Sequence, residues 1–587
     1  MGKASIGLRA VVLTGVMAMA LAACGGSSGG SSKNPGDSGS GPVKGGTITF
    51  LTLEDQFQDL DPQRNYTGEN LAFASAYITL TLNAFKLSPD GKTANELTPD
   101  MATDTGTPNA DATSWSWTLK DGIKWQDGSA VTCDDVKYGV SRTFATTVIT
   151  NGPSYAIQYL DIPTDKDGNS IYKGPYVKNS TAAQAAFDKA VTCDGNKITF
   201  NLNKPVGDFN FTVTLTAFAA VPKAADTGEK YDDKVISDGP YQIQEYTKGS
   251  QMVLVRNQNW SKSTDSYRPA YPDKIIVKFG LDSSVIDQRL IQDSGDDQHA
   301  LTVGDVVQPS NLATVFGSDR FASRRVNGYD PYVRYYAVNV KSVPNLDQRK
   351  AIAAALDRAQ LRTIAGGAYA GDLADGVIKP NLPADYAPSG MWTGLLGQNI
   401  PDSGDPNYAK QLVQQSGQPM KTIQFDYPQT PTNDRAAAAV VSSLGKAGIK
   451  VKPNPIEAGQ FYGIVFDPNK EGDLVAAGWG PDWPNASTVV PPLFTPTGGF
   501  DLSQVNDKAF NARVDAASKL TDIGQQAEQW KALNKEAMAQ VWVIPTRFGK
   551  QQRLAGSKVH NASGKNGQVY FWAPYGSWSY ADLYVTP

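Results

Sequence analysis

Residues that could perform acid–base or metal chemistry are scarce in this sequence. Its 587 residues include two histidines, His299 and His560, and each stands alone in polar sequence. A Ser-His-Asp triad or a histidine-containing metal cluster needs partners that this pattern does not supply. The sequence also lacks a GxxxxGK(S/T) phosphate loop, so any ATP hydrolysis would need a separate subunit. We therefore expect no catalysis, no cofactor and no bound metal.

Two short segments have the outline of a site without its context. Gly26-Ser27-Ser28-Gly29-Gly30 fits the GxSxG nucleophile pattern, but no strand precedes it and no helix follows it. Residues 165–169, Asp-Lys-Asp-Gly-Asn, are faintly similar to a calcium loop but lack its spacing and its terminal Glu. We interpret the first segment as linker and the second as a solvated turn.

The N-terminal residues predict an exported protein. Lys3 and Arg9 precede an apolar run over residues 10–21, which is too short to cross a bilayer as a permanent helix. A charged start, a short apolar segment and small residues at its end are typical of a secretory signal peptide. We expect the signal peptide to cover residues 1–23.

A cysteine follows this leader directly. Leu21-Ala22-Ala23-Cys24 resembles the lipobox of bacterial lipoproteins, in which cleavage leaves the cysteine as the lipid-bearing first residue. An ordinary cleavage site beside a chance cysteine is the alternative. Residues 25–42 are almost wholly Gly, Ser, Asn, Asp and Pro, which is the composition of a flexible tether. We expect residues 24–44 to hold the protein at the outer face of the cell membrane through lipid alone.

Cys133 and Cys193 are the other two cysteines. Outside the cell, and without a CxxC or His-rich context, such a pair predicts a disulfide. The closed loop of about 60 residues would stabilise the fold by ~4 kcal/mol in the chain-entropy account. Two separate buried thiols are the alternative.

The composition indicates a soluble body with several packed cores. The residues are 40% hydrophobic and 19% charged, and 54 basic side chains stand against 58 acidic ones, for a net charge of −4. A slightly acidic chain argues against nucleic acid as a partner. No later segment reaches the ~18 uncharged apolar residues of a membrane-spanning helix.

Local patterns predict the elements that would position a site. Residues 46–51 alternate as a strand, and residues 115–119 and 123–125 flank a Lys-Asp-Gly turn, which predicts a β-hairpin. Thr132 precedes two acidic residues, which predicts a helix capped by its hydroxyl group. Strands at 423–427 and 449–451, a helix between them at 433–446, and further helices at 347–364, 506–520 and 525–540 are also expected.

An ordered series of short motifs carries a family resemblance. Taken together, they resemble the family 5 extracytoplasmic solute-binding proteins of peptide and nickel ABC importers, over residues 45 to about 545. The motifs are Gly45-Gly46-Thr47, Leu60-Asp61-Pro62, residues 119–128, Asp134-Asp135-Val136-Lys137-Tyr138, Val221-Pro222-Lys223, Asp238-Gly239-Pro240-Tyr241, Asn259-Trp260, residues 349–352 with Leu356-Asp357-Arg358, and Gly478-Trp479-Gly480-Pro481-Asp482-Trp483.

The resemblance implies an α/β fold of the two-lobed periplasmic-binding-protein type II. A hinge would join the lobes, and a third domain would be inserted in the N-terminal lobe. The ligand would lie between the lobes, which close over it. The expected boundaries are residues 45–75, 205–325 and 545–587 for lobe I, 76–204 for the inserted domain, and 326–544 for lobe II.

The last motif is where the resemblance implies a ligand site. In the peptide-binding members of the family, the acid that matches Asp482 pairs with the α-ammonium group of the peptide. An ammonium group is costly to bury without a carboxylate. Gly478 and Gly480 would let a ligand backbone approach, and Trp479 and Trp483 would supply apolar walls. The alternative is a rigid turn in which the acid bonds its own backbone.

Tyr66 and Gly68 match a second pocket-lining segment by spacing alone, and core packing is an equal alternative for Tyr66.

The resemblance implies a monomer that delivers short peptides to an ABC permease with its ATPase subunits. Oligosaccharide transport and, less favoured, a lipid-anchored glycosidase stay as alternatives. The glycosidase would need two carboxylates about 5–9 Å apart, which no spacing singles out. Nickel is disfavoured by the shortage of histidine.

Overall fold

The computed structural model describes residues 41–57, 59–457, 460–563 and 567–587. Residues from Pro42 to Pro587 form one folded unit. The predicted signal peptide, Cys24 and almost all of the tether lie outside the described residues. No helix in the described ranges is both long enough and apolar enough to cross a membrane.

A five-stranded sheet contains the first strand of the described residues. Its order is β11 (Ala300–Thr302), β1 (Thr47–Leu51), β10 (Lys274–Lys278), β9 (Gln251–Arg256) and β8 (Tyr241–Thr247). β1 confirms the strand predicted at 46–51 and pairs in parallel with both of its neighbours. Helix α1 (Gly68–Tyr77) packs on this sheet, with the rings of Phe50 and Phe73 5.7 Å apart. We call the surrounding cluster the first core; it includes Ile48, Phe50, Phe73, Leu254 and Trp578.

The predicted hairpin at residues 115–125 is wrong. β5 (Ser114–Thr118) pairs instead with β7 (Lys197–Asn201), within a sheet that also holds β4 (Thr107–Pro108) and β6 (Val191–Asp194). This register sets Trp115 against Phe200 and Trp117 against Ile198. Burial of these large side chains outweighs the local turn signal. They belong to the second core, which includes Leu80, Trp115, Trp117, Phe200 and Phe218.

A helix start and a disulfide fix one edge of the second core. Thr132 accepts a hydrogen bond from the backbone N–H of Asp135, whose side chain accepts in return, which confirms the predicted cap of α3 (Cys133–Arg142). Cys133 is bonded to Cys193 of β6, with their Cα atoms 5.9 Å apart. The bond therefore links a helix to the edge of the four-stranded sheet.

A six-stranded sheet organises the C-terminal half. Its order is β13 (Gly371–Leu373), β17 (Val543–Leu554), β12 (Arg325–Val338), β16 (Leu474–Trp479), β14 (Ile423–Pro428) and β15 (Val451–Ile456). β14 and β15 are parallel and joined by α12 (Pro431–Lys446), which confirms the predicted β-α-β unit. We call the cluster around this sheet the third core; it includes Ile352, Phe425, Leu474 and Trp530.

Helices cover this sheet. The single helix predicted at 347–364 is two, α9 (Leu346–Ala355) and α10 (Arg358–Ile364), because the Asp357 side chain accepts a hydrogen bond from Gln360 N–H and starts a second helix. The two later predicted helices are confirmed as α15 (Lys508–Ser518) and α16 (Ile523–Ala539). α11 (Pro406–Gln415) begins after its cap at Asp405.

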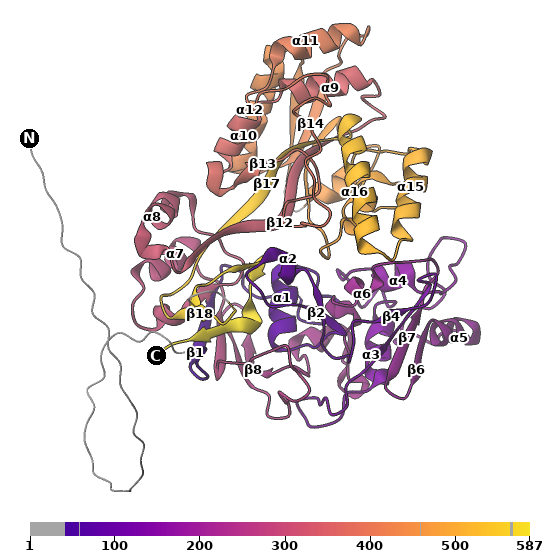
Figure 1. Cartoon of the computed structure of the whole chain (residues 1–587), viewed down its shortest axis with the longest axis vertical. Coiled ribbons are helices and arrows are strands. Elements are labelled where there is room, and N and C mark those ends of the chain that lie inside the picture. The colour runs from indigo at the N-terminus through magenta and orange to yellow at the C-terminus, as the bar shows by residue number, and fades with distance from the viewer. Residues whose placement is uncertain (1–40, 58, 458–459, 564–566) are drawn as a thin grey trace, which may run out of the picture. The chain divides into compact units, whose positions relative to one another are not determined.

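The long strands β12 and β17 connect the first and third cores, and Figure 1 shows them running from the indigo and magenta part of the body to the orange part. Their pairing is interrupted between Tyr329 and Val333, where Pro331 cannot donate a hydrogen bond. The Lys379 ammonium group donates to the carbonyl oxygens of Asp330, Tyr332 and Gly549 at 2.6, 2.8 and 2.9 Å. The buried Lys379 ammonium group thus binds the backbone carbonyl groups where the pairing of β12 and β17 is interrupted.

Other elements are short. The helices are α2 (Gly91–Ala94), α4 (Tyr155–Tyr159), α5 (Thr181–Ala190), α6 (Phe209–Thr212), α7 (Ser283–Gln292), α8 (Leu312–Gly317), α13 (Phe461–Val465) and α14 (Val490–Phe494). The strands are β2 (Asn83–Phe85), β3 (Leu97–Pro99), β18 (Val559–Asn561), β19 (Phe571–Trp572), β20 (Ser577–Trp578) and β21 (Leu583–Val585).

Candidate functional site

Asp482 lies where segments from distant parts of the sequence meet. It follows the end of β16, and its backbone N–H donates to Thr488 Oγ1 at 3.2 Å. Its half-buried carboxylate accepts hydrogen bonds from the hydroxyl groups of Tyr155, in α4, and Tyr66, just before α1. The carboxylate is therefore held by two tyrosines and does not bond its own backbone N–H.

This carboxylate is negatively charged, and no basic side chain in the part of the chain that the structure describes neutralises it. Burial raises the pKa of Asp482 to about 6, while hydrogen bonds from Tyr155 and Tyr66 act in the opposite direction. At neutral pH the group is therefore mostly ionised. No lysine or arginine among the described residues contributes to this pKa. A cation that entered the site would find an unpaired acceptor.

The tyrosines around Asp482 remain protonated donors. Burial, followed by the charge of Asp482, raises the pKa of both Tyr66 and Tyr155 above its ordinary value. Burial also raises the pKa of Tyr332 to about 12. Tyr66 and Tyr332, beside this half-buried carboxylate, are 39% and 38% exposed. Their exposed surfaces are available to a ligand.

Trp479 forms part of an aromatic wall. Its indole N–H donates to the Thr488 carbonyl oxygen at 2.7 Å, and its ring lies 4.7 Å from that of Phe500. Phe500 also contacts Tyr462 and Phe466, at 5.5 and 5.2 Å between ring centroids. Tyr462 and Phe466 are 44% and 43% exposed. The wall thus presents open aromatic surface.

Gly478 and Gly480 allow neighbouring side chains to lie close to the backbone. A Cβ atom at Gly478 would lie 2.6 Å from Arg334 Nη1, and one at Gly480 would lie 3.1 Å from Tyr332 Cδ1. Larger residues would therefore displace the two side chains that lie across the end of β16. Glycine here keeps Arg334 and Tyr332 against the backbone.

Trp483 is buried and does not face an open space. It is 1% exposed, belongs to the first core, and lies 4.8 Å from the ring of Tyr155. Its indole N–H donates to the buried Asp208 carboxylate at 2.8 Å, which also accepts from the Ser487 hydroxyl group. In this conformation Trp483 supports Tyr155 from behind and anchors the motif to the N-terminal part of the chain.

Gly68 is the first residue of α1, and a Cβ atom there would lie 2.8 Å from the Tyr575 carbonyl oxygen. Close packing of this helix against the Tyr575 backbone therefore explains why the residue is glycine. Tyr66, two residues earlier, is the member of this segment that contacts Asp482.

Tyr155, Tyr332 and Arg334 were not predicted from the sequence. Tyr155 follows an ordinary Gly-Pro-Ser turn and meets Asp482 across 327 positions of sequence, so no local pattern indicates the contact. Arg334 is easier to notice in the sequence than Tyr155, because it is a charged residue within the otherwise apolar run 333–338.

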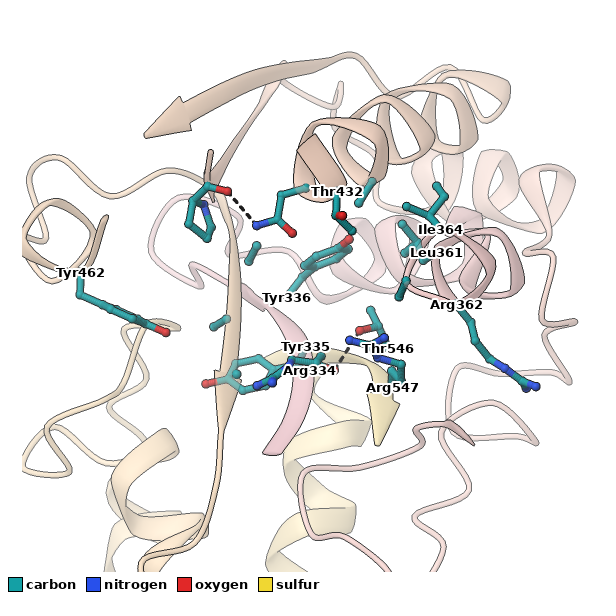
Figure 2. Close-up of a pocket in the computed structure, with 17 residues that line it drawn as sticks. Arg334, Tyr335, Tyr336, Leu361, Arg362, Ile364, Thr432, Tyr462, Thr546 and Arg547 are labelled. Carbon is teal, nitrogen blue, oxygen red and sulfur yellow. Dashed lines mark hydrogen bonds between the residues drawn. The ribbon is translucent and has the colours of Figure 1, made fainter. Parts of the chain in front are cut away.

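A cavity of about 300 Å³ opens beside Gly478, between the six-stranded sheet and helices α10 and α12. Figure 2 shows Arg334 and Arg547 together on one side of it, with Tyr336, Ile364 and Thr432 across from them. Its lining combines cationic, hydroxyl and aliphatic groups.

Comparison with known proteins assigns the family. Residues 96–501 match the family described as bacterial extracellular solute-binding proteins, family 5 (middle region). The chain belongs to this family. As a family 5 protein it has the two-lobed α/β periplasmic-binding fold of its solved relatives.

This family 5 chain is similar to individual relatives at low sequence identity but over most of its length. The periplasmic murein peptide-binding protein MppA of Escherichia coli (strain K12) is 22% identical over 476 residues, covering 77% of this chain and 79% of MppA. The dipeptide-binding protein of the same organism is 22% identical over 557 residues, covering 89% and 94%. The structure of clavulanic acid biosynthesis oligopeptide binding protein 2 matches with a TM-score of 0.82 and 25% identity, over 93% of this chain and 97% of that one.

Proposed function

We propose that this family 5 protein binds short peptides between its lobes, with the ligand's α-ammonium group on Asp482. The observation that carries this proposal is an ionised, half-buried carboxylate that accepts from two tyrosines and pairs with no basic side chain among the described residues. A ligand ammonium group would neutralise this charge and donate charge-assisted hydrogen bonds. Neutral ligands leave the charge unpaired.

The end of β16 would hold the ligand backbone. On the side of β14, β16 is paired only at Leu474 and Val475. Its last residues are therefore open on that side to pair with an extended peptide. Such pairing reads no side chains, and the aromatic wall around Trp479 offers nonspecific apolar contact. Broad specificity among short peptides follows. The names of the relatives, which refer to murein peptides, dipeptides and oligopeptides, support the ligand class.

The transport role follows from the same assignment. The protein would be exported, anchored through a lipid on Cys24, and held at the outer face of the cell membrane as a monomer. Lobe I (residues 45–75, 205–325 and 545–587), with its inserted domain (76–204), and lobe II (326–544) would close over the peptide. An ABC permease with ATPase subunits would receive it.

A comparison of blocked and unblocked ligands tests the proposed function. Isothermal titration of the chain with a series of unblocked tri- and tetrapeptides should show binding, and Nα-acetylation of each peptide should weaken it by about 30-fold or more. Acetylation removes the cation but keeps the peptide backbone. Equal affinity for both forms would overturn the placement of the ammonium group on Asp482, and binding of oligosaccharides alone would overturn the ligand class.

A further inference from the structure

A cavity of about 590 Å³ lies on the outer face of the five-stranded sheet, away from the peptide site. Successive side chains of a strand point to opposite faces of its sheet. Ile48 and Ile275 belong to the first core, so Thr47 and its register partner Lys274 lie on the other face. Lys278, four positions further along β10, shares that face. Figure 1 shows β1 close to the C-terminal end of the chain at this part of the body.

The walls of this cavity come from segments that are distant in sequence. Arg289 of α7 lines one wall, and its guanidinium group pairs with Asp297 at 2.6 Å. His299 lines another, and its Nε2–H donates to the Thr586 carbonyl oxygen at 2.9 Å. The sheet, α7 and the residues after β21 therefore enclose a built cavity on the surface of the first core.

Three lysines at this cavity have no anionic partner. They are Lys44, Lys274 and Lys278, and we call them the lysine face. None of the three side chains forms an ion pair or hydrogen bond with another described residue. The acidic groups that line the same cavity are the side chain of Asp296 and the carboxylate of Pro587, the last residue of the sequence. An anion that entered would therefore meet unpaired ammonium groups.

The acids next to the cavity already have basic partners. Asp273 pairs with Arg256 at 3.2 Å, and Asp297 pairs with Arg289. Along β10, the two strand lysines are about 13 Å apart at the backbone. This separation suits a row of phosphate groups better than one small anion.

The position of the lysine face in the chain favours a membrane as its partner. Lys44 is the last residue of the predicted tether, 20 positions after Cys24. A flexible segment of that length spans about 25 Å root-mean-square, so a lipid on Cys24 would keep the lysine face near phospholipid headgroups. We propose that the lysine face binds the phosphate groups of anionic phospholipids. The inference rests on the proposed function only for the lipid on Cys24, and it adds a second membrane contact to that lipid.

Sedimentation with vesicles tests this contact. The chain from Gly25 onward contains the whole folded unit and lacks the lipid, so its membrane affinity comes from the protein surface alone. It should bind vesicles of phosphatidylglycerol and phosphatidylcholine, mixed in about a 1:2 ratio, and not vesicles of phosphatidylcholine. Each lysine near an anionic surface contributes about fivefold. The triple variant Lys44→Gln, Lys274→Gln, Lys278→Gln should therefore bind about 100-fold more weakly.

A matched control separates the lysine face from the net charge of the chain. The triple variant Lys166→Gln, Lys178→Gln, Lys230→Gln removes three exposed lysines that also have no partner among the described residues. It changes the net charge equally and should keep most of the vesicle affinity. Both triple variants should keep the melting temperature and the peptide affinity of the unaltered chain, because neither alters the peptide site.

Three outcomes would overturn the lysine face. They are no binding of the unaltered chain to either kind of vesicle, equal binding to both, and equal losses of affinity in the two triple variants. Failure of vesicle binding with intact peptide binding leaves the proposed peptide function standing. Failure of peptide binding with intact binding to anionic vesicles overturns the peptide function and leaves the lysine face standing.

Discussion

At the scale of single residues, Asp482 should make peptide binding depend on pH. Burial raises its pKa in the free protein from 3.8 to about 6, and a bound ammonium group would lower it again. Binding below that pKa has to release a proton. Affinity should therefore be nearly full above about pH 7, be about halved near pH 6, and approach a tenfold loss per pH unit at lower pH. Titration between about pH 5 and 7.5 measures the slope, and a flat profile would argue against this carboxylate.

Replacement of the same residue gives a matched test. Asp482→Asn keeps the size of the side chain but removes its charge, so unblocked peptides should bind more weakly by about 2 kcal/mol or more, which is roughly 30-fold. Asp165→Asn, in a solvated turn with an exposed side chain, is the control and should bind normally. An unchanged affinity in Asp482→Asn would remove this residue from the site.

The sequence could indicate Asp482 but not its surroundings. The motif at 478–483 stands out because its glycines, tryptophans and acid are contiguous. Tyr155 comes from α4, and its contact with Asp482 exists only because Trp483 packs behind its ring in the first core. Such a contact depends on how separate cores are assembled, which local spacing does not encode.

At the scale of elements, the disulfide should stabilise the second core. Cys133 and Cys193 are 60 positions apart, and a cross-link of that span restricts the unfolded chain by ~4 kcal/mol. The double variant Cys133→Ser, Cys193→Ser should unfold at lower denaturant concentration, with the loss confined to the transition that reports on Trp115 and Trp117. Reductant should reproduce this effect in the unaltered chain and have none in the variant. Equal stability of both proteins would contradict the prediction.

Elements were predictable where their partners are close in sequence. The β-α-β unit over β14, α12 and β15 is formed by consecutive segments, and each carries its own pattern. β5 was recognised as a strand, but its partner β7 lies about 80 positions later, and the intervening turn signal suggested the wrong pairing. Alternation of apolar residues identifies a strand without identifying its neighbour.

At the scale of the whole molecule, the site joins parts of the chain that have separate cores. Trp483 follows β16 of the six-stranded sheet and packs in the first core. Its indole N–H donates to the Asp208 carboxylate. Tyr155 and Tyr66 reach the same carboxylate from two other segments. A ligand that binds Asp482 therefore affects the N-terminal and C-terminal parts together.

Peptide binding should for this reason stabilise both parts at once. At a free peptide concentration of about 100 times Kd, the free energy of unfolding should rise by about 2.7 kcal/mol. Differential scanning calorimetry should show every transition of the chain moving upward, and Nα-acetylated peptide is the control that should move none. A shift limited to one transition would mean that the ligand contacts a single lobe.

Native mass spectrometry of the purified protein would show whether its ligand is a short peptide. The chain would be purified from its own host without denaturation, and the molecules released from it would be weighed. We predict a heterogeneous set of masses that fit short peptides. A discrete oligosaccharide mass, with no peptides, would keep the family and fold but contradict the ligand and the role of Asp482.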